Sequence, residues 1–304
     1  MGLYDYHWVD VFTDRPYGGN PLTVFPTAQG LEERQMLLLA RELSNSETVF
    51  IFPATNPEAD VRLRFFSPTG EMPLAGHAVL GAHFVLALLG HVTLTEPVTQ
   101  VKQEVGEEVL PVEVMVKEGE VTSVIMTAAH PRFSQPFSDK SLVEAALGVP
   151  EERIGPGDLL PQVVDLGLPY LVVPVEDMRA IQEVVPDREL MAQLKGRVGT
   201  DRVYLFTMET EEESATVHGR HATTGDPRVR EDPVSGSGVA AVGAFLVRNE
   251  VLLAAPQVDL VVEQGHEIGR PGKAQVRVIS HEGKVKEVKV GGPVVHVGSG
   301  RFEI

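Results

Sequence analysis

Hydrophobic and polar positions follow two different periods along this chain, and the changes of period predict where strands and helices lie. Residues 6–12 (YHWVDVF) and 22–25 (LTVF) have the short alternating or apolar pattern of strands. Residues 31–43 place Leu and Met at helical spacing after an acidic start, which predicts a helix. The apolar segments TVFIF and VRLRFF, at 48–52 and 61–66, predict two further strands.

The middle of the chain holds a long apolar segment and then a Val-rich one. HAVLGAHFVLALLG, at 77–90, predicts a helix that Gly90 closes. Residues 92–125 are rich in Val with short charged interruptions, which is typical of an antiparallel meander. Residues 127–139 contain Pro and Ser, and we interpret them as a linker.

The second half repeats this arrangement loosely. Its predicted elements are a helix near 140–147, strands within 162–174, helices within 176–195, the strands YLFTM and ATVHGR, a helix over 236–249, the strand VDLVVEQG, and two more Val-rich strands.

A seven-residue phrase precedes the apolar helix in each half. EMPLAGH begins at Glu71 and EDPVSGS at Glu231, 160 residues later, and both follow the template Glu-x-Pro-x-small-Gly-polar. A repeat this long indicates duplication of a domain rather than a solenoid. We therefore predict two similar α+β domains, 1–126 and 127–304, each a sheet carrying a central helix. The boundary allows the last strand, about 293–304, to return to the first domain.

Composition excludes several classes of function. The chain has 304 residues and 43% of them are hydrophobic, so it can bury a substantial core. Its 26 Lys and Arg against 43 Asp and Glu give a formal charge of −17, which argues against nucleic acid and anionic membranes as partners. It has no cysteine, which excludes disulfides and thiolate catalysis. We find no signal peptide and no apolar stretch long enough to cross a bilayer, and we expect a cytoplasmic protein.

Each repeated phrase opens a helix with a small residue and glycine. Gly76 and His77 begin one helix, and Gly236, Ser237 and Gly238 begin the other. Free backbone N–H groups at a helix start bind anions, and glycine permits close approach. Either motif alone is compatible with an ordinary helix cap. If the domains face each other about a pseudo-twofold axis, both starts converge on one cleft that would bind a carboxylate.

Familiar catalytic and cofactor motifs are absent, namely H-E-x-x-H, G-x-S-x-G and a Walker phosphate loop. GSGVAA matches a dinucleotide fingerprint, but the charged, Pro-containing residues before it cannot form the buried strand that the fingerprint requires. His218 and His221 form an H-x-x-H pattern without a further ligand nearby in sequence. We therefore expect no cofactor and no metal.

Proton transfer by ionisable side chains near a bound carboxylate remains. The candidates are Glu47, Glu71, His77, Glu231 and Asp232. Glu47 lies before an apolar strand, where partial desolvation would suit a base, although local sequence alone favours a solvated turn glutamate. His77 is either a neutral hydrogen-bonding imidazole at a helix start or a surface residue of the first helical turn.

Five motifs, in order, resemble the PhzF-like family of phenazine-biosynthesis isomerases and their relatives. They are DVFTDRPYGGNPLTVF, SNSETVFIF, RFFSPTGEMPLAGHAVLGA, EDPVSGSGVAA and VEQGHEIGRPG, and they span residues 10 to 272. The resemblance implies the diaminopimelate-epimerase-like fold, with two pseudo-symmetric domains that each wrap a sheet around a central helix.

The resemblance also implies the roles of single residues. Where thiol racemases of this fold carry cysteines, this chain has Ala75 and Ser235. PhzF-like enzymes use one glutamate, which matches Glu47 as general acid/base. The match further assigns catalytic roles to His77 and Asp232, and substrate binding to Gly76, Gly236 and Ser237.

The implied activity is cofactor-independent isomerisation, in which a proton moves between carbons of a small carboxylated metabolite. The family's namesake acts on trans-2,3-dihydro-3-hydroxyanthranilate, and relatives are commonly homodimers, which we expect here. The chain keeps Arg220 of the family's Arg-x-Phe-x-Pro segment but has Ala222 and Thr224 in place of Phe and Pro, which puts the substrate in doubt. An epimerase that uses Glu47 and His77 as opposed groups and a catalytically silent binding protein are the alternatives.

Overall fold

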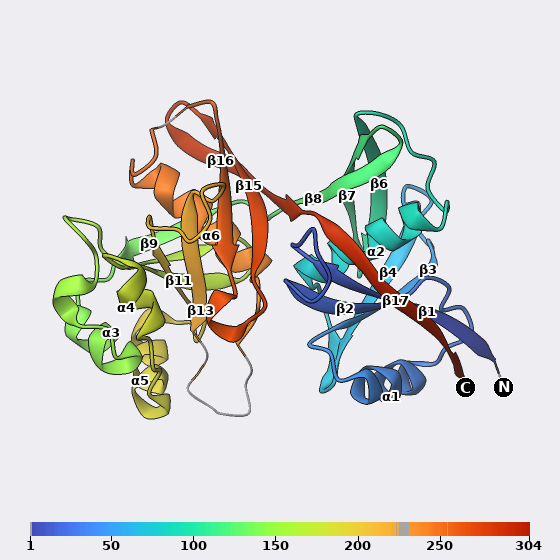
Figure 1. Cartoon of the computed structure of the whole chain (residues 1–304), viewed down its shortest axis with the longest axis horizontal. Helices are drawn as coiled ribbons and strands as arrows, with labels where there is room; N and C mark the ends of the chain where they lie inside the picture. Colours follow the sequence, from blue (N-terminus) through green and yellow to red (C-terminus); the bar gives the residue numbers. More distant parts are fainter. Residues whose placement is uncertain (1, 223, 225–230, 254) are drawn as a thin grey trace. The chain divides into compact units, whose positions relative to one another are not determined.

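The computed structural model describes residues 2–222, 224, 231–253 and 255–304 of the chain (Figure 1). The chain divides into two compact units. Unit 1 comprises Met1–Thr127 together with Gly291–Ile304, and unit 2 comprises Ala128–Val290. Unit 1 is therefore built from both ends of the chain, whereas unit 2 is continuous.

Unit 1 is a curved mixed sheet with one helix inside it and one outside. Its strands pair in the order β17-β1-β2-β3-β4-β6-β7-β8, with the short β5 on β4; the β2–β3 and β4–β6 pairs are parallel and the others antiparallel. The elements are β1 (Leu3–Val11), β2 (Asn20–Phe25), α1 (Glu33–Leu43), β3 (Thr48–Pro53), β4 (Val61–Ser67), β5 (Gly70–Met72), α2 (Gly76–Leu88), β6 (Val98–Val105), β7 (Glu108–Lys117), β8 (Glu120–Thr127) and β17 (Val294–Glu303).

Helix α2 is the core of unit 1. Ten of its 13 residues are buried, which is expected of a helix that is apolar on every side. It packs against β1, β2, β3, β7 and β8. Gly81 is needed for this packing, because a Cβ there would lie 2.3 Å from the Leu22 side chain. Helix α1 lies outside the sheet and covers an aromatic cluster in which the rings of Phe25 and Phe50 stack at 4.8 Å.

Unit 2 has the same plan with more helices. Its strands pair in the order β9-β10-β11-β12-β13-β14-β15. The elements are β9 (Arg132–Pro136), α3 (Lys140–Leu147), the 3₁₀ turn η1 (Glu151–Arg153), β10 (Gln162–Asp165), β11 (Pro169–Pro174), α4 (Met178–Gln182), α5 (Arg188–Val198), β12 (Val203–Thr207), β13 (Val217–Ala222), α6 (Gly236–Arg248), β14 (Gln257–Gln264), η2 (His266–Ile268), β15 (Gly272–His281) and β16 (Lys284–Gly292).

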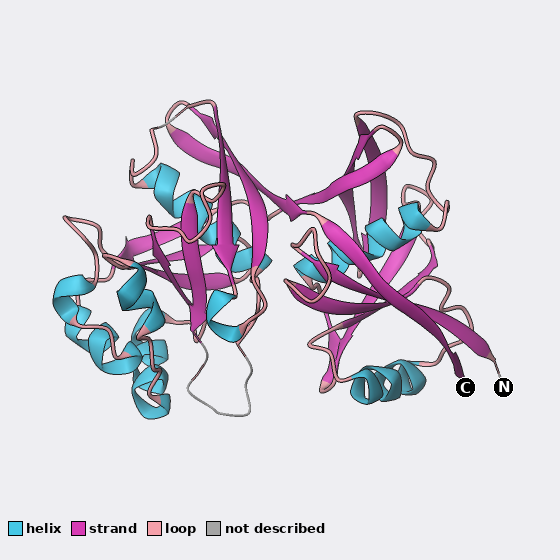
Figure 2. Ribbon diagram, viewed as in Figure 1, coloured by secondary structure: helices cyan, strands magenta, loops and turns pink. Residues whose placement is uncertain are grey.

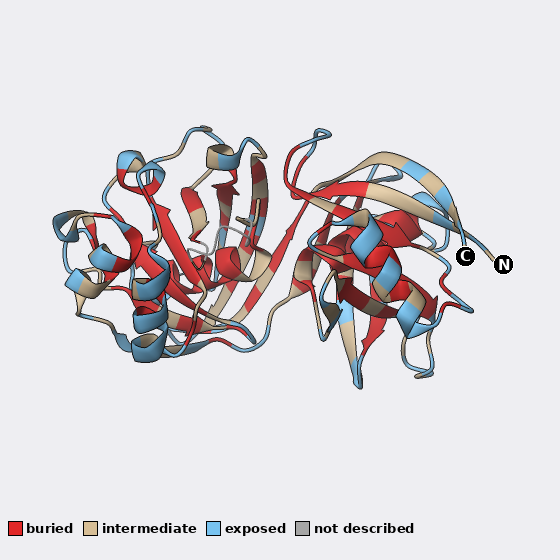
Figure 3. Ribbon diagram, turned by 90° about the horizontal axis from the view of Figure 1, so that it is seen from below, coloured by how far each residue is buried: buried red, intermediate tan, exposed pale blue. Residues whose placement is uncertain are grey.

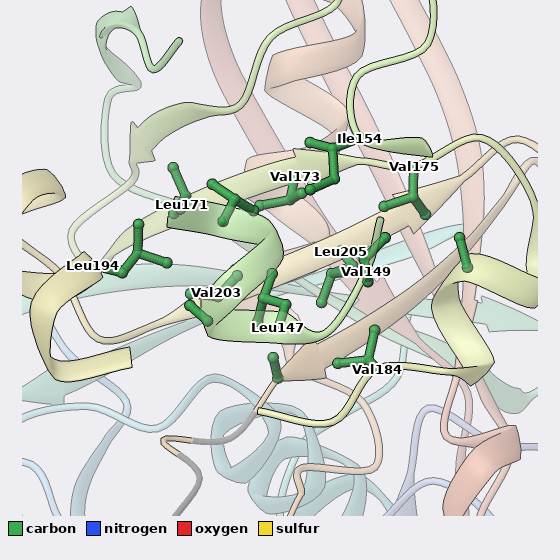
Figure 4. Close-up of a cluster of buried hydrophobic side chains, with 14 of the residues drawn as sticks. Leu147, Val149, Ile154, Leu171, Val173, Val175, Val184, Leu194, Val203 and Leu205 are labelled. Carbon is green, nitrogen blue, oxygen red and sulfur yellow. The ribbon is translucent and has the colours of Figure 1, made fainter. Parts of the chain in front are cut away.

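Helix α6 is the buried centre of unit 2, and helices α3, α4 and α5 cover the outer face of the sheet (Figure 2). The outer helices enclose an aliphatic cluster that includes Leu147, Leu171, Leu194 and Leu205 (Figure 4). In both units, the central helix and the strands that pack against it contain most of the buried residues (Figure 3).

The two units repeat one sequence of strand pairings, which confirms the predicted fold class. β10–β11 matches β1–β2, β11–β12 matches β2–β3, β12–β13 matches β3–β4, β13–β14 matches β4–β6 and β14–β15 matches β6–β7, each in the same parallel or antiparallel sense. The central helices begin at Gly76 and Gly236, and each follows a bend at the proline of the repeated phrase. The chain is an α+β protein made of two similar domains.

One sequence prediction was wrong in detail. The segment 127–139 is not only a linker, because β9 occupies Arg132–Pro136 and pairs with β10. Its prolines misled the prediction, since proline is tolerated at the end of an edge strand. The helices predicted within 176–195 are present as two, of which α4 ends at Gln182 and α5 begins at Arg188, with Pro186 between them. Asp177 and Asp187 then cap the two helices, each by accepting a backbone N–H.

Among the described residues, no helix is long and apolar enough to cross a membrane.

Candidate functional site

Glu47 and His77 meet in unit 1. Glu47 lies directly before β3, and His77 is the second residue of α2. Their atoms Oε2 and Nε2 are 3.1 Å apart, and their side chains are 17% and 10% exposed. The two residues are 30 positions apart in sequence, so β3, β4 and the turn to α2 together bring them into contact.

The turn before Glu47 is fixed by its neighbours. Ser44 ends α1 in the left-handed conformation, with φ of 53°. The buried Asn45 then donates from Nδ2 to Oγ1 of Thr23 on β2, at 2.9 Å. Since Thr23 pairs with Thr48 in the sheet, this bond ties the turn to the strand that follows it. Glu47 therefore lies in a turn that a buried side-chain hydrogen bond holds against the sheet.

The environment of Glu47 favours its ionised form. Burial alone raises its pKa, but the charge and hydrogen bond of His77 and a hydrogen bond from Ser46 lower it, and the net shift is downward. A half-buried carboxylate that is ionised at neutral pH can accept a proton. His77 is held at the positive end of the α2 dipole and beside this carboxylate, where it can hydrogen-bond a substrate group.

The start of α6 in unit 2 is a hydroxyl cluster. The Oγ atom of Ser235 lies 2.9 Å from the hydroxyl of Tyr170, and Ser237 donates from Oγ to the same hydroxyl at 3.1 Å. Burial raises the pKa of Tyr170, although the two serines partly offset it. Tyr170 therefore stays a neutral phenol between two hydroxyl groups.

Asp232 is held through its backbone. Its carbonyl oxygen accepts a hydrogen bond from Nε2 of Gln264 at 2.6 Å, and Oε1 of Gln264 accepts from the Ser235 N–H at 3.0 Å. Tyr204 donates its hydroxyl to the same Oε1 at 2.7 Å. Burial, with Asp232 as a further cause, raises the pKa of Tyr204 well above its usual value.

The glutamates of the repeated phrase have equivalent arginine partners. Arg64 on β4 binds Glu71 through Nε and Nη2, at 2.7 and 2.6 Å. Arg220 on β13 binds Glu231 in the same way, at 2.9 and 3.1 Å. A guanidinium that makes two parallel hydrogen bonds to one carboxylate fixes the orientation of both groups. This arrangement favours a structural role for both glutamates over the proton transfer considered from sequence.

His218 belongs to a buried cluster with Glu263, His266 and Glu267. His218, Glu263 and His266 place ligand atoms within 4.8 Å of one another, which is close enough to hold a metal ion. However, Nδ1 and Nε2 of His218 already bind Glu263 at 2.8 Å and Glu267 at 2.9 Å. Burial lowers the pKa of His218, but the two carboxylates raise it to about 9. A protonated imidazole cannot ligate a metal, so this donor set fits an ion-paired histidine better.

The structure thus places every predicted site residue at one of the two helix starts. Glu47, Gly76 and His77 lie at the start of α2, and Asp232, Gly236 and Ser237 lie at the start of α6. That the two starts share one cleft stays a prediction. Sequence reasoning missed Tyr170, Tyr204 and Gln264. Only Gln264 carried a signal, because it belongs to the VEQG motif.

Comparison with known proteins gives the same family that the five sequence motifs resemble. The family described as phenazine biosynthesis-like protein matches residues 9–300. A protein of Mesorhizobium japonicum named an uncharacterized isomerase is 30% identical over 100% of both chains. One of Clostridium acetobutylicum with the same kind of name is 29% identical, over 97% of this chain and 96% of its own.

Solved structures repeat the fold. A PhzF-family phenazine biosynthesis protein of Bacillus anthracis has a TM-score of 0.88 and 26% identity, with 100% of both chains covered. A predicted epimerase of Pseudomonas aeruginosa has a TM-score of 0.79 and 28% identity over 99% of both chains. A hydroxyproline epimerase of Agrobacterium vitis, at 14% identity and a TM-score of 0.64 over 99% of this chain and 92% of its own, shares the fold alone.

Proposed function

Because the chain belongs to the phenazine biosynthesis-like protein family, we propose that it is an isomerase that moves a proton between carbon atoms of a small carboxylated substrate. The curated relatives named isomerases support the reaction class. The observation that carries the proposal is the Glu47–His77 pair, with 3.1 Å between Oε2 and Nε2 at the first turn of α2.

Glu47 is the acid/base of the proposed reaction. Its carboxylate takes a proton from a substrate carbon, and the electron pair of the broken C–H bond enters the π-system of the substrate. The protonated carboxyl exchanges its proton with solvent and then delivers a proton to another carbon of that π-system, so the enzyme ends as it began. Since one group accepts and donates the proton, the reaction needs no cofactor.

The start of α2 stabilises the negative charge that this step creates. The first backbone N–H groups of a helix have no acceptor within the helix and attract anions. A Cβ at Gly76 would meet only the sulfur of Met126, at 3.7 Å, so packing does not require glycine there. Close approach of a substrate to the backbone accounts for Gly76 better. His77 binds a polar group of the substrate.

We assign matching roles to the start of α6. The N–H groups of Gly236 and Ser237 bind a carboxylate, and Asp232 binds a polar substituent and can relay a proton. Ser235 and Ala75 precede the two helices, where the thiol racemases of this fold carry cysteine. These positions therefore supply no thiol in this chain, and a two-thiol mechanism is excluded.

A test measures uptake of solvent deuterium. The protein is incubated in heavy water with trans-2,3-dihydro-3-hydroxyanthranilate and with a panel of small cyclic amino and hydroxy acids. Mass spectrometry and NMR should find deuterium at a substrate carbon, and Glu47→Gln should abolish it. Uptake that persists in Glu47→Gln would contradict the proposed role.

Epimerisation is the second candidate, and the Pseudomonas aeruginosa neighbour described as a predicted epimerase favours it. That reaction needs two groups on opposite faces of one carbon, and the 3.1 Å contact between Glu47 and His77 counts against these two residues as that pair. The same samples distinguish the two reactions. An isomerase produces a product with a moved double bond, whereas an epimerase produces the mirror configuration at one carbon, which chiral chromatography detects.

A further inference from the structure

The VEQG motif has no role in the mechanism above, yet its glutamine is a centre of contacts in unit 2. Gln264 is the last residue of β14 and is fully buried. Its Oε1 accepts from the Ser235 N–H and the Tyr204 hydroxyl, and its Nε2 donates to the Asp232 carbonyl. One side chain therefore binds the residues on both sides of Pro233 and Val234.

The orientation of this amide is fixed by its partners. The Ser235 N–H can only donate, and the Asp232 carbonyl can only accept. A flipped amide would bring two donors together at Ser235 and two acceptors together at Asp232. The glutamine can therefore hold the segment in only one way.

The next residue packs on the same segment. Gly265 has φ of +90°, and a Cβ there would lie 2.7 Å from the carbonyl oxygen of Pro233 and 2.4 Å from that of Arg270. Only glycine fits this conformation and this space. Gln264 and Gly265 together thus hold the backbone of residues 232–235.

The internal duplication provides a comparison. The β6–β7 pair of unit 1 is equivalent to the β14–β15 pair of unit 2. Its last paired residues are Val105 and Glu108, and those of β14–β15 are Gln264 and Gly272. Val105 is therefore the counterpart of Gln264 in unit 1. The preceding residues, Glu104 and Glu263, keep one task in both units. Glu104 accepts from the backbone of Thr55 and Asn56, and Glu263 accepts from that of Glu211 and Glu212.

The fold therefore needs a glutamate at the next-to-last position of this strand, but it does not need a glutamine at the last position. Val105 is buried and has no polar group in its side chain, and α2 still begins at the equivalent position. Tyr204 also has an apolar counterpart in unit 1. Phe50 pairs with Arg64, and Leu205 pairs with the equivalent Arg220. The residues before them, Val49 and Tyr204, are therefore equivalent. The polar network is particular to the start of α6.

We propose that Gln264 is a positioning residue, which fixes Asp232 and the Ser235 amide so that the first turn of α6 can bind the substrate. This inference rests on the proposed function of that turn. The side chain acts through Asp232 and Ser235, and it does not itself touch the substrate.

The test compares three variants of the full chain. Gln264→Leu removes all three hydrogen bonds at similar volume. Gln264→Glu keeps an acceptor for Ser235 and Tyr204 but, when ionised, has no donor for Asp232. Gln103→Leu is the matched control, because Gln103 is a fully buried glutamine of unit 1 that binds His83 at 3.0 Å, and His83 lies seven residues beyond the start of α2.

Hydrogen exchange followed by mass spectrometry gives the first readout. Gln264→Leu should speed exchange in peptides covering residues 231–240 by about tenfold, the effect of losing buried hydrogen bonds. Gln103→Leu should leave these peptides unchanged. Equal exchange in wild type and Gln264→Leu would overturn the proposal, whatever the activity.

Deuterium uptake into trans-2,3-dihydro-3-hydroxyanthranilate, or another acid that wild type labels, gives the second readout. Gln264→Leu should lower kcat/KM by about tenfold or more, and Gln103→Leu should not. Gln264→Glu should recover towards wild type as the pH falls, because a protonated carboxyl regains the donor for Asp232. Activity of Gln264→Leu equal to that of wild type would also overturn the proposal.

The two proposals fail in different ways. If the wild-type protein introduces deuterium into none of the acids, the proposed function fails. Hydrogen exchange of residues 231–240 in Gln264→Glu still tests the positioning role, because protection of these amides should recover at low pH if Gln264 holds this segment. If wild type is active and Gln264→Glu shows neither loss nor pH-dependent recovery, the positioning role fails and the proposed function stands.

Discussion

Arg220 binds both carboxylate oxygens of Glu231, and the pair repeats in unit 2 the contact that Arg64 makes with Glu71 in unit 1. Both arginines lie on equivalent strands, and both glutamates open the repeated phrase. The pairs differ in exposure. Arg220 and Glu231 are 14% and 13% exposed, whereas Arg64 and Glu71 are 25% and 38% exposed.

This difference predicts unequal effects on stability. Arg220→Met should lower the free energy of unfolding by about 2–3 kcal/mol, because it leaves the buried Glu231 unpaired and also removes bonds to the carbonyls of Ile181 and Gln182. Arg64→Met should cost about 1 kcal/mol or less. Urea unfolding measures both values. Equal losses would show that burial does not set the strength of these pairs.

Substitution of Glu47 should remove activity without removing the fold. Glu47→Gln keeps the shape but cannot accept a proton, and deuterium uptake should fall by about 10²–10⁴-fold. Glu42→Gln is the control, because Glu42 is an exposed residue of α1. Circular dichroism should give the same spectrum for both variants and wild type. A Glu47→Gln protein with more than about a tenth of wild-type activity would exclude Glu47 as the base.

His77 should set the acidic limit of activity. It lowers the pKa of Glu47, and activity needs the ionised carboxylate, so the rate falls as the pH drops through that lowered pKa. In His77→Asn the carboxylate loses this neighbour, its pKa rises, and the acidic limb of the pH–rate profile moves to higher pH. The profile of kcat/KM measures the shift. An unmoved or lower acidic limb would mean that the pair is not coupled.

The His218 cluster should make stability fall at alkaline pH. The pKa of His218 is raised to about 9, so its contribution is complete below the unfolded value of 6.5 and is lost as the pH rises through about 9. The lowered pKa values of Glu263 and Glu267 act oppositely, and their contribution is lost as the pH falls below 4.5.

Thermal unfolding between pH 6 and pH 10 measures this effect. The Tm of wild type should decline across that range more steeply than the Tm of His218→Gln. His130→Gln is the control, because His130 is exposed. Parallel curves for wild type and His218→Gln would show that His218 is not held in its charged form.

Much of the fold follows from local patterns in the sequence. The all-round apolar character of α2 and α6 predicts their burial, and the repeated phrase predicts where both begin. The contacts of Gln264 could not be predicted in this way. They depend on the register of β13 against β14, where Gly219 faces Gln264, and no local pattern specifies a register between distant strands.

The candidate site can be predicted from sequence only in part, because contacts between distant segments also leave no local pattern. Glu47 and His77 are recognised by resemblance to a family, because local sequence alone favours a solvated turn glutamate at position 47. Their contact depends on the packing of β3 beside the turn into α2, which periodicity does not reveal. The homodimer, the cytoplasmic location and the absence of a cofactor stay predictions.

The strand β17 also determines when unit 1 can be completed during synthesis. Nine of its ten residues pair along β1, from Leu3 with Glu303 to Val11 with Val294, and Val297 lies at a shift of register. All of unit 2 lies between these two strands in sequence, so a ribosome releases unit 2 before it releases the partner of β1. A nascent chain therefore carries an open edge on β1 until residues 294–303 have been synthesised, and a chain that stops short of residue 294 retains that edge as a site for pairing with other chains.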